Sequence, residues 1–199
     1  MRRIIAFDRV SADGYFATPD GNLDWAVPEP DFEQGIARNM GTGGTMLFGR
    51  KTYDMFEAFW PKALEDPKTS PDPHVEGRRS EGLRAMAVWI NEAEKLVFSR
   101  SRKEVTWKNS HLYGELDPRQ IEALKAKSGS DIMIFGSSSV VSKLTEHGLV
   151  DEYHFLTTPV FLGGGRSLLT GLPKHAKVEL LEAKPFPHGN VFLKYAPSR

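Results

Sequence analysis

Two basic residues and a hydroxyl residue follow a short apolar run, and together they could bind an anion. The run covers 45–48, and Gly49 separates it from Arg50, Lys51 and Thr52. Aromatic residues then recur at helical spacing, which predicts a strand that ends at the glycine and a helix that begins at Arg50. The free N–H groups of a helix start carry partial positive charge, so a phosphate is a natural ligand here. The alternative is a solvated helix start that is simply basic.

The same segment imitates a phosphate-binding P-loop, which reads G-x-x-x-x-G-K-[ST]. The four residues between Gly44 and Gly49 are Thr-Met-Leu-Phe, a sequence typical of a buried strand, and Arg50 stands where the P-loop has lysine. Because a strand cannot also be the loop that wraps around phosphates, we exclude ATPase and kinase chemistry for this segment.

A second candidate segment is the Gly-Ser-Ser-Ser sequence at 136–139, which follows the apolar run 131–135. Small residues let a ligand approach the backbone closely, and hydroxyl groups with helix N–H groups suit a phosphate or a carboxamide. The segment is not the G-x-S-x-G elbow of hydrolases, because Val140 stands at the last glycine position, and it is not the G-x-G-x-x-G dinucleotide fingerprint. An ordinary serine N-cap is the alternative.

A third polar group consists of Ser99, Arg100 and Ser101, at the end of the apolar run 95–99. The sheets of α/β proteins bind ligands at the carboxyl ends of their strands. The planar guanidinium of arginine suits a ribose 2′-phosphate. This segment therefore predicts a further anion contact.

The elements that must position these groups alternate between strands and helices, which predicts an α/β fold. The predicted strands are 3–9, 45–48, 95–99, 111–113, 131–135 and 152–158, and the predicted helices are 31–40, 50–59, 119–127 and 139–146. Residues 177–183 and 190–196 predict a β-hairpin that packs antiparallel on the edge of the sheet. Residues 62–82 are rich in proline and charge, which predicts an excursion from the core, either a lid or a plain surface loop.

Composition narrows the possible classes of protein. The chain has 199 residues, 40% of them hydrophobic, which favours one folded domain over 1–199. Lysine plus arginine and aspartate plus glutamate both total 26, so no basic field exists to hold nucleic acid or an anionic membrane. Cysteine is absent, which excludes metal sites with thiolate ligands and fits a cytoplasmic protein. No apolar run reaches the ~18 residues that a membrane-spanning helix needs. No metal site is expected, because the histidines lie in separate segments: His74, His111, His147, His154, His175 and His188.

The ordered set of motifs resembles the dihydrofolate reductase superfamily. It is most similar to the reductase domain of bifunctional riboflavin-biosynthesis deaminase-reductases and to their stand-alone bacterial relatives. The segments that carry the resemblance span nearly the whole chain: 11–17, 23–25, 47–53, 97–101, 134–137 and 158–165. The resemblance implies a three-layer α/β sandwich, with a mostly parallel mixed sheet, an antiparallel C-terminal hairpin and helices on both faces.

The resemblance also implies an NADPH-dependent reductase. The start of the 50–59 helix would lie against the cofactor diphosphate, the end of the 95–99 strand would face the 2′-phosphate, and the turn after 131–135 would pass the diphosphate and the nicotinamide ribose. Dihydrofolate reductases have a cis peptide bond in that turn, between two glycines, where this chain has Gly136-Ser137. The implied cofactor-binding residues are Gly49, Arg50, Lys51, Thr52, Ser99, Arg100, Ser101, Gly136, Ser137, Ser138, Ser139 and Val140.

The substrate half of the site is implied by fewer residues. The 11–17 loop would cover the nicotinamide, with Val10 and Asp13 at the mouth of the pocket. Trp25 either stacks on the substrate ring or packs in the core. Asp31 is the candidate proton relay or substrate anchor, because dihydrofolate reductases carry their catalytic carboxylate on the helix before the second strand.

We therefore expect hydride transfer from NADPH to a C=N or C=O carbon of a pterin-, pyrimidine- or aminouracil-type substrate. The alternative is a non-catalytic nucleotide-binding or regulatory protein on the same fold. The relatives also imply a homodimer, for which the C-terminal hairpin offers a surface. Residues 163–166 form either a substrate-phosphate site or a tight turn.

Overall fold

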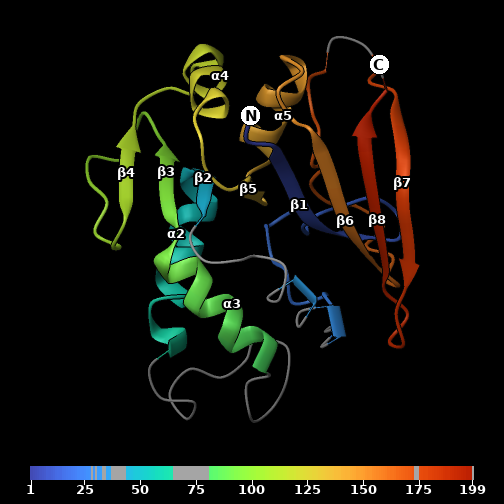
Figure 1. Cartoon of the computed structure of the whole chain (residues 1–199). Helices are drawn as coiled ribbons and strands as arrows, with labels where there is room; N and C mark the ends of the chain where they lie inside the picture. Colours follow the sequence, from blue (N-terminus) through green and yellow to red (C-terminus); the bar gives the residue numbers. More distant parts are fainter. Residues whose placement is uncertain are drawn as a thin grey trace.

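A mixed sheet organises the molecule, and its strands follow the order β4-β3-β2-β5-β1-β6-β8-β7 (Figure 1). The computed structural model describes residues 1–27, 29, 31–32, 35–36, 44–64, 81–172 and 175–198. Neighbouring strands from β4 to β6 run parallel, whereas β8 pairs antiparallel with β6 and with β7. The strands are β1 (Ile4–Ser11), β2 (Thr45–Gly49), β3 (Glu94–Phe98), β4 (Ser110–Tyr113), β5 (Ile132–Phe135), β6 (Glu152–Thr158), β7 (Val178–Pro185) and β8 (Val191–Pro197).

Helices cover both faces of the parallel part of the sheet. They are α2 (Arg50–Phe59), α3 (Glu81–Glu92), α4 (Pro118–Ala126) and α5 (Ser138–Glu146), with a short 3-10 helix, η1 (Lys62–Leu64). Strand β2 shows why its sequence is apolar throughout. Met46 and Phe48 pack with α2 and α3 on one face, and Leu47 packs with α5 on the other. The predicted α/β sandwich with helices on both faces is confirmed.

The helix α4 begins as its sequence predicts. Asp117 is the N-cap residue, and its side chain accepts a hydrogen bond of 3.0 Å from the backbone N–H of Arg119. Pro118 occupies the first helical position, where its missing N–H costs nothing.

Helix α3 was not predicted, and it begins at Glu81, where the excursion expected over 62–82 ends. Leu83, Ala87 and Ile90 recur at helical spacing and are buried against β2 and β3, so the helix is stabilised by its apolar face. The proline-rich sequence before it concealed this pattern. Residues 65–80, which form most of the predicted excursion, lie outside the described residues.

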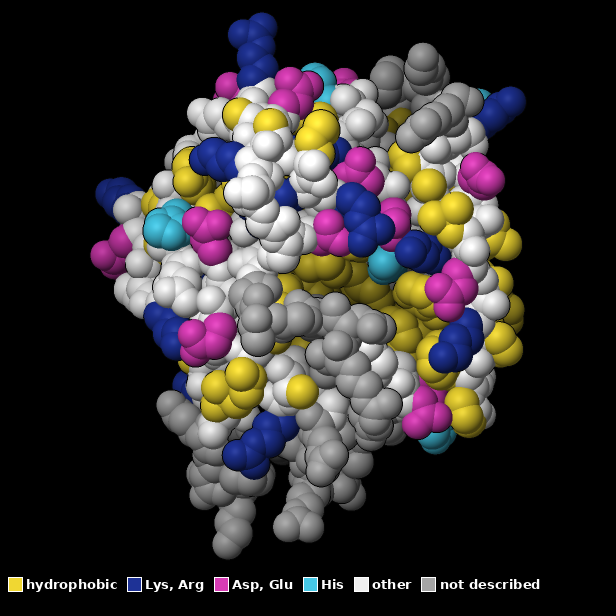
Figure 2. All heavy atoms as spheres, in the orientation of Figure 1, with side chains coloured by type: hydrophobic (Ala, Val, Ile, Leu, Met, Phe, Trp, Pro, Cys, Tyr) yellow, Lys and Arg dark blue, Asp and Glu magenta, His cyan; other side chains and the backbone are white. Residues whose placement is uncertain are grey.

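The C-terminal hairpin forms the far edge of the sheet, as predicted. Strand β7 is exposed along its whole length, and a register irregularity lies between Leu180 and Glu182. Val178, Leu180 and Leu181 are about half exposed, and Figure 2 shows hydrophobic side chains along this edge of the molecule. Within the described part of the chain, no helix is long and apolar enough to cross a membrane.

The connections that follow β1 and β5 leave the sheet on opposite faces. Phe32, in the helical turn after β1, stacks on Phe7 with ring centroids 5.6 Å apart, on the face that carries α2 and α3. Helix α5, which follows β5, packs on the other face. Strands β1 and β5 are neighbours, so a crevice is expected beyond their carboxyl ends.

Candidate functional site

A cleft of about 1470 Å³ lies beyond the carboxyl ends of four neighbouring parallel strands. Residues 7–9 of β1 line the cleft beside the end of β5. The other three strands contribute their last residues or the segments that follow: 49–52 from β2, 98–101 from β3 and 135–140 from β5. All three of the predicted anion-binding segments therefore meet at one cleft. Figure 2 shows a hollow floored by hydrophobic side chains on this face of the molecule.

The segments after β2 and β5 are joined by two reciprocal hydrogen bonds, which we call the clasp. The backbone N–H of Gly49 donates to Ser137 Oγ over 3.1 Å, and the backbone N–H of Ser137 donates to Thr52 Oγ1 over 3.0 Å. The clasp holds the starts of α2 and α5 side by side. Neither helix start has a side-chain cap, so first-turn N–H groups of both helices are left for a ligand.

The backbone of the second segment is in the left-handed region at two consecutive residues. Gly136 has φ 57°, and Ser137 has φ 53° and ψ 49°. A non-glycine residue seldom adopts this conformation, and such residues concentrate at functional sites. The Gly136-Ser137 peptide bond is trans, so the cis bond of dihydrofolate reductases is not shared.

Thr52→Val tests the clasp. It removes the acceptor of the Ser137 N–H, which is partly buried, and we expect the free energy of unfolding to fall by about 1–3 kcal/mol in chemical denaturation. Thr52→Ser keeps the hydroxyl and should retain most of the stability. Equal stability of the valine variant and wild type would show that the clasp contributes nothing.

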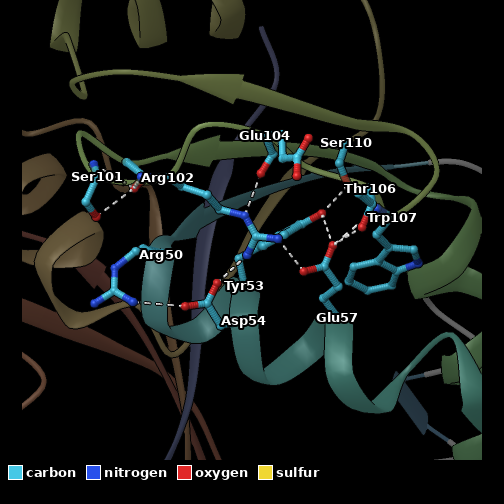
Figure 3. Close-up of polar contacts among 11 residues, drawn as sticks. Arg50, Tyr53, Asp54, Glu57, Ser101, Arg102, Glu104, Thr106, Trp107 and Ser110 are labelled. Carbon is cyan, nitrogen blue, oxygen red and sulfur yellow. Dashed lines mark hydrogen bonds and ion pairs between the residues drawn. The ribbon is translucent and has the colours of Figure 1, made fainter.

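In the segment after β3, a serine side chain binds the backbone of the turn and an arginine side chain binds helix α2. Ser99 Oγ accepts hydrogen bonds from the backbone N–H groups of Ser101, at 3.3 Å, and Arg102, at 2.9 Å. The guanidinium of Arg102 lies 4.7 Å from the centre of the Tyr53 ring and pairs with Asp54 and Glu57 on α2 (Figure 3).

The two arginines of this segment therefore differ in their surroundings. Arg102 is bound to α2 through its two carboxylate partners, whereas Arg100 is exposed and lines the cleft. Arg50 also lines the cleft, and its guanidinium forms a 3.0 Å ion pair with Asp54 (Figure 3). Arg102 was not singled out in the sequence, because nothing in its local pattern shows that it reaches a neighbouring helix.

The other end of the cleft is aromatic and apolar. Trp25 lines it and is half-buried, and its indole Nε1 donates to the carbonyl of Asn22 over 3.2 Å. The remaining apolar residues that line this part include Phe7, Phe32, Phe56, Phe59, Trp60, Leu83 and Met86. A planar ring could pack here, because aromatic walls with a few polar groups are typical of small-molecule sites.

Three residues predicted for the substrate half do not line the cleft. Asp13 instead accepts backbone N–H groups of the 159–165 loop, at 3.2 Å from Leu162 and 2.8 Å from Gly163. Val10 and Asp31 are likewise absent from the walls, and Asp31 is exposed. Asp13 thus joins two loops, and in the helical turn after β1 the residue that packs on the sheet is Phe32. The roles expected of Val10, Asp13 and Asp31 stay predictions.

The 163–166 segment bends beside the 11–17 loop. Residues Ala17 and Arg166 form a β-bridge, and Arg166 Nε donates to the carbonyl of Pro19 over 3.1 Å. Ala17 and Arg166 both line the cleft, so this segment shapes one of its walls.

The cleft also contains a carboxyl group that the sequence analysis did not single out. Asp8 lies on β1, is 3% exposed, and its Oδ2 has no hydrogen-bond partner among the described residues. Burial raises the pKa of this carboxyl well above its usual range, and a hydrogen bond with the Gly136 backbone lowers it by less. The signal in the sequence was an acidic residue directly after the apolar run 4–7 of the first predicted strand.

The comparisons with known proteins agree with this fold. The family model of the RibD C-terminal domain matches residues 2–192. An uncharacterized protein of Bacillus subtilis (strain 168), YyaP, is 28% identical over 197 residues, which cover 98% of this chain and 95% of the relative.

Two solved structures share the fold. A putative riboflavin biosynthesis protein from Shewanella sp. PV-4 has a TM-score of 0.72 at 22% identity and covers 99% of both chains. A dihydrofolate reductase from Enterococcus faecalis, complexed with NADP(H) and RAB-propyl, has a TM-score of 0.62 at 13% identity, over 99% of this chain and 97% of that one. The fold is therefore dihydrofolate-reductase-like. Because the family model matches nearly the whole chain, the protein belongs to the RibD C-terminal domain family.

Proposed function

We propose that this protein is an NADPH-dependent reductase that transfers a hydride to a planar heterocycle of the pterin, pyrimidine or aminouracil type. The observation that carries the proposal is the convergence of three anion-binding segments on one cleft with an aromatic end. Family membership supports a reductase-like fold, and one structural neighbour was solved with NADP(H).

The cofactor half of the proposal rests on the charged and hydroxyl residues of the cleft. The starts of α2 and α5 would receive the diphosphate, since both present uncapped first-turn N–H groups. Arg100 would meet the 2′-phosphate, because it lines the cleft and is exposed to a ligand there. NADPH would supply the hydride, and the protein would orient it against the substrate.

The substrate half rests on the aromatic end of the cleft. A flat ring would lie against the aromatic side chains that line the cleft, with its reducible C=N or C=O bond toward the carboxyl ends of β1 and β5. One structural neighbour is described as a putative riboflavin biosynthesis protein, which favours an aminouracil-type substrate over a pterin.

Nicotinamide fluorescence tests the cofactor claim directly. We expect saturable binding of NADPH with a dissociation constant below about 1 mM, and tighter binding of NADPH than of NADH. Titration of both nucleotides against the full chain measures this, and no saturation below about 1 mM would refute the cofactor assignment.

The rival function is a non-catalytic nucleotide-binding or regulatory protein on the same fold. The two differ in turnover, because a binding protein shows affinity for NADPH without consuming it. Steady NADPH oxidation in the presence of a pterin or an aminouracil separates them. We further propose a cytoplasmic homodimer in which the exposed apolar side chains of β7 face a second copy of the chain, as expected for a contiguous apolar patch.

A further inference from the structure

Asp8 occupies the point of the sheet where ligands of α/β folds bind. It lies on β1 one residue beyond Phe7, which pairs with Phe135 at the end of β5. The connections after these two strands leave on opposite faces, so the crevice between their carboxyl ends is a topological switch point. Asp8 is among the residues that line the cleft there.

Only part of the hydrogen-bonding capacity of the Asp8 carboxyl group is used within the described residues. The backbone of Gly136 hydrogen-bonds to it, whereas Oδ2 is buried and has no partner among the described residues. An ionised carboxylate without a countercharge is strongly disfavoured in such surroundings, and the neutral acid is favoured. A neutral acid has one O–H group to donate, and in the described residues nothing accepts it.

The charged groups around Asp8 do not change this conclusion. Arg9 follows it on β1, but its side chain lies on the other face of the strand and donates to the carbonyl of Val27 over 2.9 Å. On β6, Glu152 and His154 pair in register with Ile5 and Phe7, whose side chains also lie on that other face.

Two more cations line the cleft, Lys143 from α5 and Arg166 from the 163–166 segment. Neither contributes to the pKa of Asp8, which is set by burial and by the Gly136 backbone. The neutral acid is therefore favoured, and within the described residues it has no ion pair to break before it reacts.

We propose that Asp8, and not Asp31, is the catalytic acid of the reductase, and that its Oδ2–H donates a proton to the nitrogen or oxygen of the reduced bond. The proton transfer in this inference rests on the proposed function. The neutral state of Asp8 in the free protein does not depend on that function. It also narrows the ligand to a ring that presents an unprotonated nitrogen or a carbonyl oxygen toward the end of β1.

The step balances without any further reactant. The substrate carbon would gain a hydride, with its two electrons, from the dihydronicotinamide, which would be left as the oxidised nicotinamide cation. The π bond of the C=N or C=O group breaks, and its nitrogen or oxygen gains the proton that leaves Asp8 Oδ2. The Asp8 carboxylate then regains a proton from water, which enters when the product leaves.

The neutral state can be tested without cofactor or substrate. In wild-type protein labelled with ¹³C at the aspartate side-chain carboxyl, one resonance should keep the chemical shift of a protonated carboxyl group near neutral pH. Asp8→Asn, which has nearly the same shape and no ionisable proton, should lack that resonance. A fully ionised set of aspartates near neutral pH in wild-type protein would overturn the inference, whether or not the variant folds.

Stability against pH gives a second readout with a definite sign. The folded-state pKa of Asp8 is raised, so its stabilising effect is complete below the ordinary aspartate pKa of about 3.9 and is lost as the pH rises toward the folded-state pKa. Within that window, the unfolding equilibrium constant of wild type should rise about tenfold per pH unit relative to that of Asp8→Asn. A constant ratio across the window would contradict a neutral Asp8.

Turnover tests the proton transfer itself. With a substrate that wild type reduces, Asp8→Asn should bind NADPH normally and lose about 100- to 10,000-fold in kcat, with little change in KM. The wild-type rate should fall as the pH rises through the pKa of Asp8, and the residual rate of the variant should not. Glu122→Gln, on the exposed face of α4, is the matched control for loss of a carboxylate.

The outcomes separate the two proposals. Failure of NADPH to bind to wild type would refute the proposed function and leave the neutral Asp8 standing on the ¹³C result. Normal turnover in Asp8→Asn, or loss of turnover in Asp31→Asn and not in Asp8→Asn, would overturn the role of Asp8 and leave the reductase standing.

Discussion

Arg100→Ala should weaken NADPH binding by about 10- to 30-fold and leave NADH binding unchanged. The two nucleotides differ only in the 2′-phosphate, which we assign to the exposed guanidinium at the end of β3. A charge-assisted hydrogen bond contributes about 1.5–3 kcal/mol, and exposure to solvent and salt favours the lower half of that range. Fluorescence titration of both nucleotides against wild type and variant measures the change.

Two comparisons sharpen this prediction. Arg119→Ala removes an exposed arginine from α4, away from the cleft, and should leave both affinities unchanged. Raising the salt concentration should narrow the wild-type preference for NADPH, because screening weakens exposed charge pairs. If Arg100→Ala weakens NADPH and NADH equally, the 2′-phosphate assignment is wrong.

Gly165→Ala should destabilise the protein by about 3 kcal/mol, which lowers the melting temperature by about 6–12 °C for a chain of this size. A Cβ atom at this position would lie 2.4 Å from the backbone oxygen of Ala17 and 2.9 Å from Tyr15. Backbone cannot move aside cheaply, so the bridge between Ala17 and Arg166 must open. Thermal unfolding measures the loss.

The neighbouring glycine provides the control. A Cβ atom on Gly164 meets nothing within 4 Å, so Gly164→Ala should leave the melting temperature close to that of wild type. Because Ala17 and Arg166 line the cleft, Gly165→Ala should also weaken NADPH binding, and Gly164→Ala should not. Similar melting temperatures for the two variants would show that the close approach at Gly165 is not a constraint.

The sequence predicted the three segments that meet at the cleft, because each of them is recognised from a local pattern. Helix α2 has the predicted bounds of 50–59, and β6 has the predicted bounds of 152–158. Each anion-binding segment directly follows a parallel strand. Since parallel strands end at the same edge of the sheet, knowing the strands was enough to bring these segments together.

The substrate half depended on contacts that no local pattern contains. Asp13 is turned toward the 159–165 loop by hydrogen bonds to residues far along the chain. Asp8 lies on a central strand between β5 and β6, and the pKa of its carboxyl is raised by a burial that only the tertiary structure creates. Arg102 acts through carboxylates on another helix, a pairing that requires the tertiary structure.

The clasp between Gly49, Thr52 and Ser137 has a consequence for the entropy of ligand binding. Its two hydrogen bonds fix the backbone of both helix starts before any ligand arrives. Ordering backbone costs about 1–2 kcal/mol per residue, and here that cost belongs to folding and is not repeated on association. The proposed dinucleotide would therefore meet a surface that is already ordered, and its affinity would depend on how well it fits that surface.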